Sequence, residues 1–345
     1  MSSRPLVSVL LPCFDAEEAL PASLDSLLGQ TYGELEVIAV DDGSTDGTLR
    51  ILEEFAARDD RVRVLGNEVN LGVIRSLNRA VAEARGELIA RMDADDTAAP
   101  TRIERQVAIL VQRPDIDVVG TGVDPVDSEG RSLRPRPVLC VGPGGARFAA
   151  LFATPLMHPT IVARAALMRA HPYGGSPQSL HTEDYEMFTR MLADGAGFYN
   201  IDEPLMVVRS DPRSVSSRFE EIQIANFIVC AGRHLERTLQ VRPAPGPHRV
   251  LVNRMGRAAT SRDLRDGLRW LDRIERAFLV REPGSAAEIR DAADLQRVDI
   301  LTQAARRGRL AVRLAAVGLA IRYGRRLLSA RSRRYLVSKL GASRR

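Results

Sequence analysis

Three aspartates at the end of an apolar stretch are the residues best suited to chemistry. Asp93, Asp95 and Asp96 directly follow residues 88–92, whose composition predicts a buried strand. Alternate residues of an extended chain point the same way, so Asp93 and Asp95 would share one face. Two hard oxygen ligands on one face suit a Mg²⁺ or Mn²⁺ ion that already holds a diphosphate. An acidic loop that caps the next helix would explain the same residues, and the cluster alone leaves both interpretations open.

A second acidic segment, residues 40–48, follows another apolar stretch. It combines Asp41, Asp42 and Asp46 with glycines and hydroxyl residues. A carboxylate can accept hydrogen bonds from a base N–H or a ribose hydroxyl, and glycine lets the backbone approach a ligand closely. The segment therefore suits a nucleoside site, and a turn capped by Asp46 is the structural alternative. It is not a GxGxxG motif, so it gives little support to a dinucleotide-binding fold.

Two further candidates have weaker support from residue type alone. Glu183 and Asp184 begin a predicted helix over residues 183–193. A carboxylate there could act as a general base, but acidic residues in a first turn are also ordinary capping. His158 precedes a proline, and a lone histidine in such a place is more often a structural loop residue. No second histidine or cysteine lies at ligand spacing, which argues against zinc.

Strand patterns alternate with helical patterns over the first third of the chain. This alternation predicts a parallel α/β sheet of nucleotide-binding architecture, in which ligands gather at the carboxyl ends of the strands. We expect Asp15 and Asp46 to cap the first two helices and Gly86 to end the third in a left-handed conformation. The expected strands span residues 7–11, 36–40, 62–65 and 88–92, and the expected helices end near Leu28, Phe55 and Ala84.

The pattern becomes less regular beyond the fourth strand. Residues 118–122 predict a strand, and residues 161–170 predict a helix. Residues 130–147 are rich in Arg, Pro and Gly and predict a loop. From Ser217 onward the pattern is helical, with a linker expected at residues 242–247 and another break at residues 281–285.

Composition bounds the class of protein. The chain has 345 residues, of which 45% are hydrophobic and 27% charged, and these values exclude a disordered chain or a disulfide miniprotein. Its three cysteines are far apart and predict neither a zinc site nor a disulfide framework, which favours a reducing compartment. No apolar stretch reaches the roughly 20 residues of a membrane span. The first apolar run is too short for a signal peptide, so we expect a cytoplasmic protein.

The net charge of +5 is unevenly distributed. Residues 300–345 contain thirteen arginines and lysines and no acidic residue, whereas acidic residues outnumber basic ones in residues 1–299. Within this segment one predicted helical stripe, flanked by arginines, consists of Leu310, Leu314, Val317, Ile321 and Leu328. Such a helix could lie on an anionic membrane surface, or it could pack on the rest of the protein with a solvated basic face, which is the slightly favoured alternative. The acidic body and the scarcity of aromatic residues in the tail argue against nucleic acid.

Taken together and in order, the motifs resemble the family 2 glycosyltransferases. The segments that carry the resemblance are residues 7–14, 26–32, 41–46, 70–72 and 85–96, Pro100 with Arg102, and residues 158–160 and 183–185. The resemblance implies an α/β fold of the GT-A nucleotide-diphospho-sugar transferase type, with a mostly parallel central sheet and a C-terminal α-helical extension. The implied division is a nucleotide-sugar-binding half over residues 1–118, an acceptor-binding half over residues 119–220, and a helical region with a basic amphipathic tail over residues 221–345.

The resemblance also implies roles in catalysis and metal binding. Asp184 would be the catalytic base, and Glu183 and His158 would lie in the acceptor site. Asp95 would bind the metal that bridges the diphosphate. Asp93 would contact the ribose or the metal. The implied metal ion is Mn²⁺ or Mg²⁺.

The nucleotide site and one departure from the family pattern complete the implied assignments. The implied nucleotide-binding residues are Pro12, Phe14, Asp41, Asp42, Asn70, Arg75, Asp93 and Ala94. Either Asp41 or Asp42 would face the base. Many relatives carry a histidine metal ligand where this chain has Asp211. Aspartate can still ligate Mg²⁺ or Mn²⁺ through oxygen, or the change could reduce activity.

The implied reaction is an inverting transfer of a hexosyl or N-acetylhexosaminyl group. The donor would be a nucleotide-diphosphate sugar, with a UDP-sugar favoured. The acceptor would be a saccharide or a lipid-linked saccharide in surface or exported polysaccharide biosynthesis. An anionic membrane surface is a candidate partner of the tail, which would place the protein peripherally on the inner face of the cell membrane; no nucleic-acid partner is expected.

Two rival functions are weighed against this reaction. A nucleotidyltransferase would need a glycine-rich phosphate loop with a basic residue after the first strand, where this chain has residues 12–15, Pro-Cys-Phe-Asp. Asp211 keeps open a second rival, a catalytically impaired family member that binds a nucleotide sugar or a partner enzyme.

Overall fold

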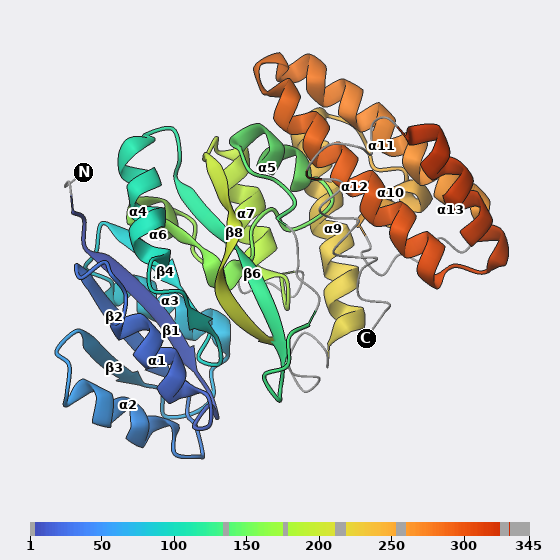
Figure 1. Cartoon of the computed structure of the whole chain (residues 1–345). Coiled ribbons are helices and arrows are strands. Elements are labelled where there is room, and N and C mark those ends of the chain that lie inside the picture. The colour runs from blue at the N-terminus through green and yellow to red at the C-terminus, as the bar shows by residue number, and fades with distance from the viewer. Residues whose placement is uncertain are drawn as a thin grey trace. The chain divides into compact units, whose positions relative to one another are not determined.

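The chain, drawn as a cartoon in Figure 1, folds into two compact units. Each unit has its own hydrophobic core. The computed structural model describes residues 4–133, 138–174, 179–210, 219–252, 260–324 and 331. The first unit comprises Met1–Val138, Leu156–Ser176 and Asp194–Ser217, and the second comprises Leu139–Pro155, Pro177–Ala193 and Arg218–Arg345. The division expected at residues 118 and 220 concerns ligand-binding halves, and it stays a prediction because compactness does not test ligand binding.

The first unit contains an eight-stranded sheet with the strand order β3-β2-β1-β4-β7-β6-β8-β5. The strands are β1 (Val7–Cys13), β2 (Leu35–Asp41), β3 (Val62–Gly66), β4 (Leu88–Arg91), β5 (Thr97–Ala98), β6 (Val118–Asp127), β7 (Val162–Arg164) and β8 (Phe198–Ser210). Strands β1 to β4 pair in parallel, as do β6 and β8, whereas β7 runs antiparallel to β4 and β6. Every residue of β2 is buried, as expected of a parallel strand covered on both faces. The predicted mixed α/β class with a mostly parallel sheet is confirmed.

The helices of the first unit lie beside this sheet and bury residues on one side. They are α1 (Leu20–Leu28), α2 (Thr48–Ala56), α3 (Val73–Glu83), α4 (Arg102–Gln112), α6 (Ala165–Ala170) and the short 3₁₀ helix η1 (His158–Thr160). In α1, the buried residues Leu20, Leu24 and Leu27 recur at helical spacing. They join a core to which β1 contributes alternate residues such as Val7 and Val9.

The predicted start of the first helix is wrong. Asp15 has a left-handed backbone with φ 45°, and its carboxylate accepts a hydrogen bond from the Thr45 backbone N–H at 2.8 Å. It therefore ties the end of β1 to the following acidic turn, and α1 begins only at Leu20. Asp46 lies one residue before the N-cap of α2, which is Gly47, so the predicted cap position is off by one. Its carboxylate nevertheless accepts from the backbone N–H of Thr48 at 3.0 Å, at the start of the helix.

The predicted role of Gly86 is also wrong. Helix α3 ends at Glu83, and Gly86 does not have a positive φ. Instead its backbone N–H donates to the Ser8 hydroxyl at 2.8 Å, and a Cβ on Gly86 would lie 2.5 Å from the Leu6 carbonyl oxygen. Glycine is needed here because β1 and the chain entering β4 approach closely. This contact helps to fix the register of β4, which carries the three-aspartate cluster.

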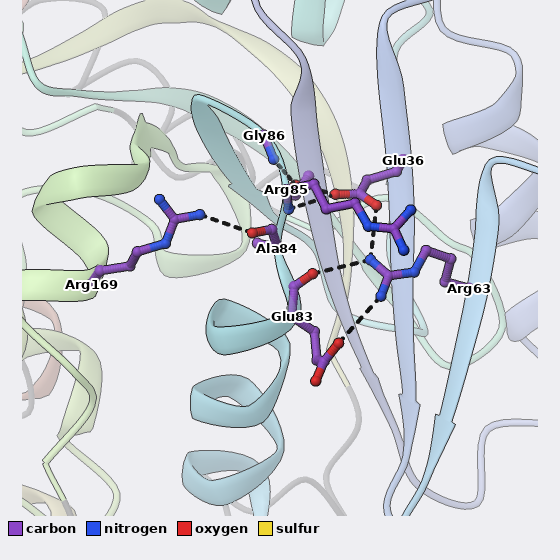
Figure 2. Close-up of polar contacts among 8 residues, drawn as sticks. Glu36, Arg63, Glu83, Ala84, Arg85, Gly86 and Arg169 are labelled. Carbon is purple, nitrogen blue, oxygen red and sulfur yellow. Dashed lines mark hydrogen bonds and ion pairs between the residues drawn. The ribbon is translucent and has the colours of Figure 1, made fainter.

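A buried carboxylate organises the same junction (Figure 2). Glu36 accepts from the Ser8 hydroxyl at 2.6 Å, the Arg85 backbone N–H at 2.9 Å and the Arg63 guanidinium at 3.0 Å. Burial opposes the charge on Glu36, but these donors together outweigh it and lower the pKa of Glu36 below its usual value. Arg63 also bonds to the Glu83 carbonyl and carboxylate, so the end of α3 is tied to β2 and β3.

Three other predicted segments differ from the structure. Residues 162–164 of the predicted helix form β7, and only residues 165–170 are helical, as α6. The predicted loop over residues 130–147 contains the start of α5. The predicted linker over residues 242–247 overlaps the start of α10.

The second unit is helical within its described residues. Its helices are α5 (Pro143–Ala149), α7 (Glu183–Ala193), α9 (Glu220–Leu239), α10 (Pro245–Val252), α11 (Ser261–Arg281), η2 (Pro283–Ser285), α12 (Ala286–Arg307) and α13 (Leu310–Tyr323). Helices α11, α12 and α13 pack together around one core (Figure 1). The predicted helical C-terminal extension is confirmed. Among the described helices, none is both long and apolar enough to cross a membrane.

Candidate active site

The two acidic segments predicted separately meet at one edge of the sheet. Strand β1 lies between β2 and β4, with Cys13 opposite Asp41 in the register. The backbone N–H of Asp42 donates to the Cys13 carbonyl at 2.8 Å. Burial raises the pKa of the Cys13 thiol, and the negative charges of Asp41 and Asp93 add to the increase. Both carboxylates therefore act on the same buried thiol at the carboxyl end of β1, where ligands gather in such sheets.

Asp41 and Asp42 differ sharply in their contacts. Oδ1 of Asp42 accepts from the Asn67 side chain at 2.7 Å and from the Leu71 backbone N–H at 2.9 Å. Its Oδ2 accepts from the Gly72 backbone N–H at 2.8 Å. By contrast, Oδ1 of Asp41 is buried without a hydrogen-bond partner among the described residues. A buried unsatisfied oxygen is costly, so Asp41 is the carboxylate with capacity left for a ligand.

The remaining nucleotide-site candidates surround this edge on loops. Phe14, just beyond β1, is 47% exposed. Gly43 has φ 72°, and a Cβ on it would lie 2.6 Å from the Val69 carbonyl carbon, so the turn after β2 packs closely on the loop before α3. Asn70 in that loop accepts from the Gly72 backbone N–H at 3.0 Å, and Arg75 follows, exposed, in the first turn of α3.

The three aspartates after β4 form the metal-site candidate. Oxygen atoms of Asp93, Asp95 and Asp96 lie within 4.8 Å of one another. Although Asp95 is exposed at the surface, the protein atoms around its carboxylate partly desolvate it and raise its pKa, and the charge on Asp93 adds to the increase. Burial also raises the pKa of Asp96, to about 8, with further increases from Asp93 and Asp95. Asp96 Oδ2 has no hydrogen-bond partner in the described chain, so the cluster fits a hard divalent cation that would offset its negative charge.

One buried cation already lies beside this cluster. The Arg91 guanidinium, on the last residue of β4, forms an ion pair with the Asp93 carboxylate. The negative charge of Asp93 raises the pKa of Arg91 despite its burial. Asp93 is thereby held in one orientation, while Asp95 is exposed at the surface.

Asp96 links the cluster to β8. Its Oδ1 accepts from the Arg209 backbone N–H at 3.0 Å. Arg209 lies near the end of β8, so this bond fixes the strand that leads toward position 211. Asp211 itself lies outside the described residues, and its assignment as a metal ligand stays a prediction.

A buried polar pair on α4, Arg102 and Gln106, supports the candidate site, and the sequence motifs assigned it no role. Arg102 donates to the carbonyl oxygens of Arg91 at 2.7 Å and Pro159 at 3.2 Å. Gln106, one turn later, donates to the Thr160 carbonyl at 2.8 Å. The pair therefore connects β4 to η1. Its signal in the sequence is two polar residues spaced by four on the otherwise apolar face of a helix.

His158 is locked into this region by a tyrosine that no sequence motif indicated. Its Nε2 lies 2.8 Å from the Tyr173 hydroxyl, and the two rings meet edge to face with centroids 5.4 Å apart. Asn78 of α3 holds the Tyr173 backbone through two hydrogen bonds, at 2.9 and 3.0 Å. Burial lowers the pKa of His158 well below its usual value, and the charge of Arg91 adds to this effect. His158 is therefore a neutral hydrogen-bonding group.

Glu183 and Asp184 lie in the first turn of α7, as predicted. The positive end of the helix dipole favours negative charge at this position. Tyr185 anchors the turn by donating to the Ala150 carbonyl at 2.6 Å. His181, just before the helix, has φ 63° and stacks on Phe219 with ring centroids 4.4 Å apart. Both acidic residues belong to the second unit, whereas the other described candidates belong to the first.

Comparison with known proteins decides the family. A sequence model described as glycosyl transferase family 2 matches residues 8–173. The Bacillus subtilis protein EpsE, named a putative glycosyltransferase, is 36% identical over 231 residues, which cover 66% of this chain and 82% of EpsE. This chain belongs to the family 2 glycosyltransferases. A Haemophilus influenzae protein named an uncharacterized glycosyltransferase is also similar, with 32% identity over 237 residues, which cover 65% of this chain and 71% of that protein.

Solved glycosyltransferase structures share the fold. Residues 1–349 of S. aureus TarS, in complex with UDP-GlcNAc, superpose with a TM-score of 0.53 at 18% identity, covering 84% of this chain and 90% of that TarS 1–349 chain. The mannosyltransferase PcManGT from Pyrobaculum calidifontis, in complex with GDP-Man and Mn²⁺, gives a TM-score of 0.52 at 20% identity, covering 98% of this chain and 85% of that one. At these identities the likeness establishes the GT-A type fold of this family 2 glycosyltransferase.

Proposed function

We propose that this glycosyltransferase carries out a metal-dependent, inverting transfer from a nucleotide-diphosphate sugar to a saccharide or lipid-linked saccharide. The observation that carries the proposal is the meeting of Asp41 and the Asp93–Asp96 cluster on either side of β1. One carboxylate is free to accept from a nucleoside, and the cluster suits a cation that binds the diphosphate. A donor with both groups would span this edge.

The donor is proposed to be a UDP-sugar, with Asp41 accepting a hydrogen bond from the base. Its buried, unsatisfied Oδ1 supports this role. The exposed aromatic residue Phe14 directly follows Cys13, the register partner of Asp41. Pro12, Asn70, Arg75 and Ala94 complete the proposed nucleotide site. Solved proteins of this fold bind UDP-GlcNAc in one case and GDP-Man in another, so the sugar is proposed only as a hexose or N-acetylhexosamine.

Asp184 is the proposed general base, with Glu183 and His158 in the acceptor site. The Asp184 carboxylate takes the proton from the acceptor hydroxyl while the oxygen of that hydroxyl forms a bond to the anomeric carbon of the donor sugar. The bond between that carbon and the diphosphate oxygen breaks on the opposite face, which inverts the configuration. Bound at Asp95 and Asp93, Mn²⁺ or Mg²⁺ would supply charge neutralisation of the leaving diphosphate. Asp211 is proposed as a further oxygen ligand.

The biological setting is proposed to be surface or exported polysaccharide biosynthesis. Bacillus subtilis TuaG, named a putative teichuronic acid biosynthesis glycosyltransferase, is 36% identical to this chain over 110 residues, which cover 32% of this chain and 44% of TuaG. The basic segment over residues 300–345 supports a peripheral position at an anionic membrane, on its inner face. There it would be close to a lipid-linked acceptor.

Nucleotide release tests the donor and the metal together. The full-length protein is incubated with UDP-, GDP- and dTDP-sugars, with Mn²⁺, with Mg²⁺ or with a chelator, and with saccharide and lipid-linked acceptor pools. We expect metal-dependent release of one nucleotide. Tight donor binding without turnover in every pool would instead favour the rival function, a nucleotide-sugar-binding or partner-binding subunit.

Asp184→Asn tests the proposed base. The amide cannot accept the proton, so we expect transfer to fall by about 10²–10⁴-fold while donor affinity changes little. Glu186→Gln is the matched control, because Glu186 lies in the same turn but pairs with Arg190. Substantial transfer by Asp184→Asn would overturn the base assignment.

A further inference from the structure

Helix α13 presents apolar residues on two opposite faces. One face packs into the core of the second unit through Val312, Ala316, Leu319, Ala320 and Tyr323. The other face is exposed, and its residues are Leu310, Leu314, Val317 and Ile321, which are 74%, 66%, 55% and 77% exposed. We call these four residues the α13 stripe; Leu328, the fifth residue of the predicted stripe, lies outside the described residues.

The α13 stripe is a continuous line along the helix. Its residues are spaced by four, three and four, so they fall on one side of a helix with 3.6 residues per turn. The side chains of Arg313 and Arg322 are exposed on the two flanks of this line. Single exposed apolar residues are ordinary, but a contiguous apolar line with a polar border is typical of an interaction surface.

The packed face of α13 is firmly held, so the exposure of the α13 stripe follows from the fold. The Tyr323 hydroxyl donates to the Asp272 carboxylate at 2.9 Å, and the Arg297 guanidinium lies 5.5 Å from the Tyr323 ring centroid. Arg297 is fully buried and pairs with Asp272 and Asp294, each at 2.7 Å, and with Glu275. Rotating α13 to bury its stripe would break this network and expose Val312 and Ala316.

We propose that the α13 stripe inserts into the surface of an anionic lipid bilayer, with its flanking arginines at the level of the headgroups. This inference rests on the membrane contact included in the proposed function and assigns it to a defined face. Residues 300–345 carry thirteen basic and no acidic residues, which is complementary to an anionic surface. A symmetric dimer through the same stripe would bring two such segments together, and their like charges would repel.

Vesicle flotation with the full-length protein tests the proposal without any donor or acceptor. Wild type is mixed with phosphatidylcholine vesicles, or with vesicles that also contain phosphatidylglycerol, at low and high salt. We expect binding to the anionic vesicles, weakened by salt because the basic contribution is screened. We expect much weaker binding to the neutral vesicles.

The double variant Leu314→Ser with Ile321→Ser replaces two of the four apolar side chains of the stripe, including the most exposed one, Ile321. We expect its affinity for anionic vesicles to fall by about tenfold or more, because the apolar contribution is lost. The matched control is Ile222→Ser with Val229→Ser, which removes two exposed apolar residues from α9 and should bind like wild type. The fluorescence of Trp270 in α11, the single tryptophan of the chain, checks that each variant is folded.

Several outcomes would overturn the inference. They are equal binding by the stripe variant and wild type, equal binding to neutral and anionic vesicles, and no binding by wild type. A dimer in solution that the stripe variant dissociates would instead assign the stripe to a second copy of the chain. Transfer to a soluble acceptor in the absence of vesicles tests the proposed function separately. A protein that does not bind vesicles can still prove to be a transferase, and a protein without transfer activity can still prove to bind vesicles.

Discussion

Asp41 and Asp42 are adjacent and chemically identical, but their surroundings give them different capacities. Asp42 uses both oxygens to hold the loop before α3. Asp41 keeps one buried oxygen without a partner in the described chain. A satisfied buried carboxylate contributes to stability, whereas an unsatisfied one costs free energy until a donor arrives. The pair therefore separates the structural role of Asp42 from the binding role proposed for Asp41.

Asparagine substitutions should separate these two roles. In Asp41→Asn the carboxylate that would accept from the base is lost, so we expect nucleotide affinity to fall by about tenfold or more with little change in stability. In Asp42→Asn an amide N–H would face the Gly72 N–H, so we expect a loss of about 1–3 kcal/mol in the free energy of unfolding. Calorimetric titration with UDP and Mn²⁺, and denaturant unfolding, measure the two effects. The reverse pattern would reassign the nucleoside contact to Asp42.

The sequence alone predicts that Asp41 and Asp42 belong to the proposed site, but it does not indicate which of the two would contact the base. The order of the motifs predicted that Asp41, Asp42 and Asp93 belong to one site. The choice depends on Asn67 and Gly72, which reach Asp42 from 25 and 30 residues away. Tyr173 was missed for the same reason, because its contacts to His158 and Asn78 are made only after the chain has folded. Local patterns carry no information about such contacts.

At the scale of elements, long periodic segments were predictable and their ends were not. The parallel strands β1 to β4 and helix α7 follow from apolar stretches and helical spacing. Gly86 was assigned to a helix end because glycine is common there, but tertiary packing against Leu6 and Ser8 decides its role. Strand β7 is three residues long and continues directly into α6, so no local signal separates the two.

Gly86→Ala tests whether this glycine is required by close approach. Its Cβ would lie 2.5 Å from the Leu6 carbonyl oxygen and 2.8 Å from that of Leu88, both of them backbone atoms that cannot move freely. We expect the free energy of unfolding to fall by about 1–3 kcal/mol, as for overpacked interior sites. Gly33→Ala is the matched control, because a Cβ there meets nothing within 4 Å. If both variants are equally stable, the close approach does not determine the residue.

At the scale of the whole molecule, the acidic residues of the proposed site, the basic segment and the buried histidines lie in different parts of the chain. The proposed chemistry lies with carboxylates, while residues 300–345 hold a purely basic segment, so the net charge of +5 describes neither part. The second unit also buries His234 in α9 and His248 in α10, whose ring nitrogens have no hydrogen-bond partner among the described residues. Composition showed five histidines but not which of them the fold would bury.

Acid should therefore destabilise the second unit. Burial lowers the pKa of His248 to about 4, and burial with the charge of Arg237 does the same for His234. Because both values lie below the usual 6.5, the unfolded chain binds protons that the folded chain does not. The contribution of each histidine to the free energy of unfolding is present above about pH 6.5 and is lost as the pH falls toward 4. At pH 5 the loss is about 2 kcal/mol for each histidine. Denaturant unfolding followed by Trp270 fluorescence at pH 8 and pH 5 measures this loss. His248→Leu keeps a buried apolar group without a titrating nitrogen, so it should remove about half of the loss. A pH response identical to that of wild type would show that His248 is not kept neutral by the fold.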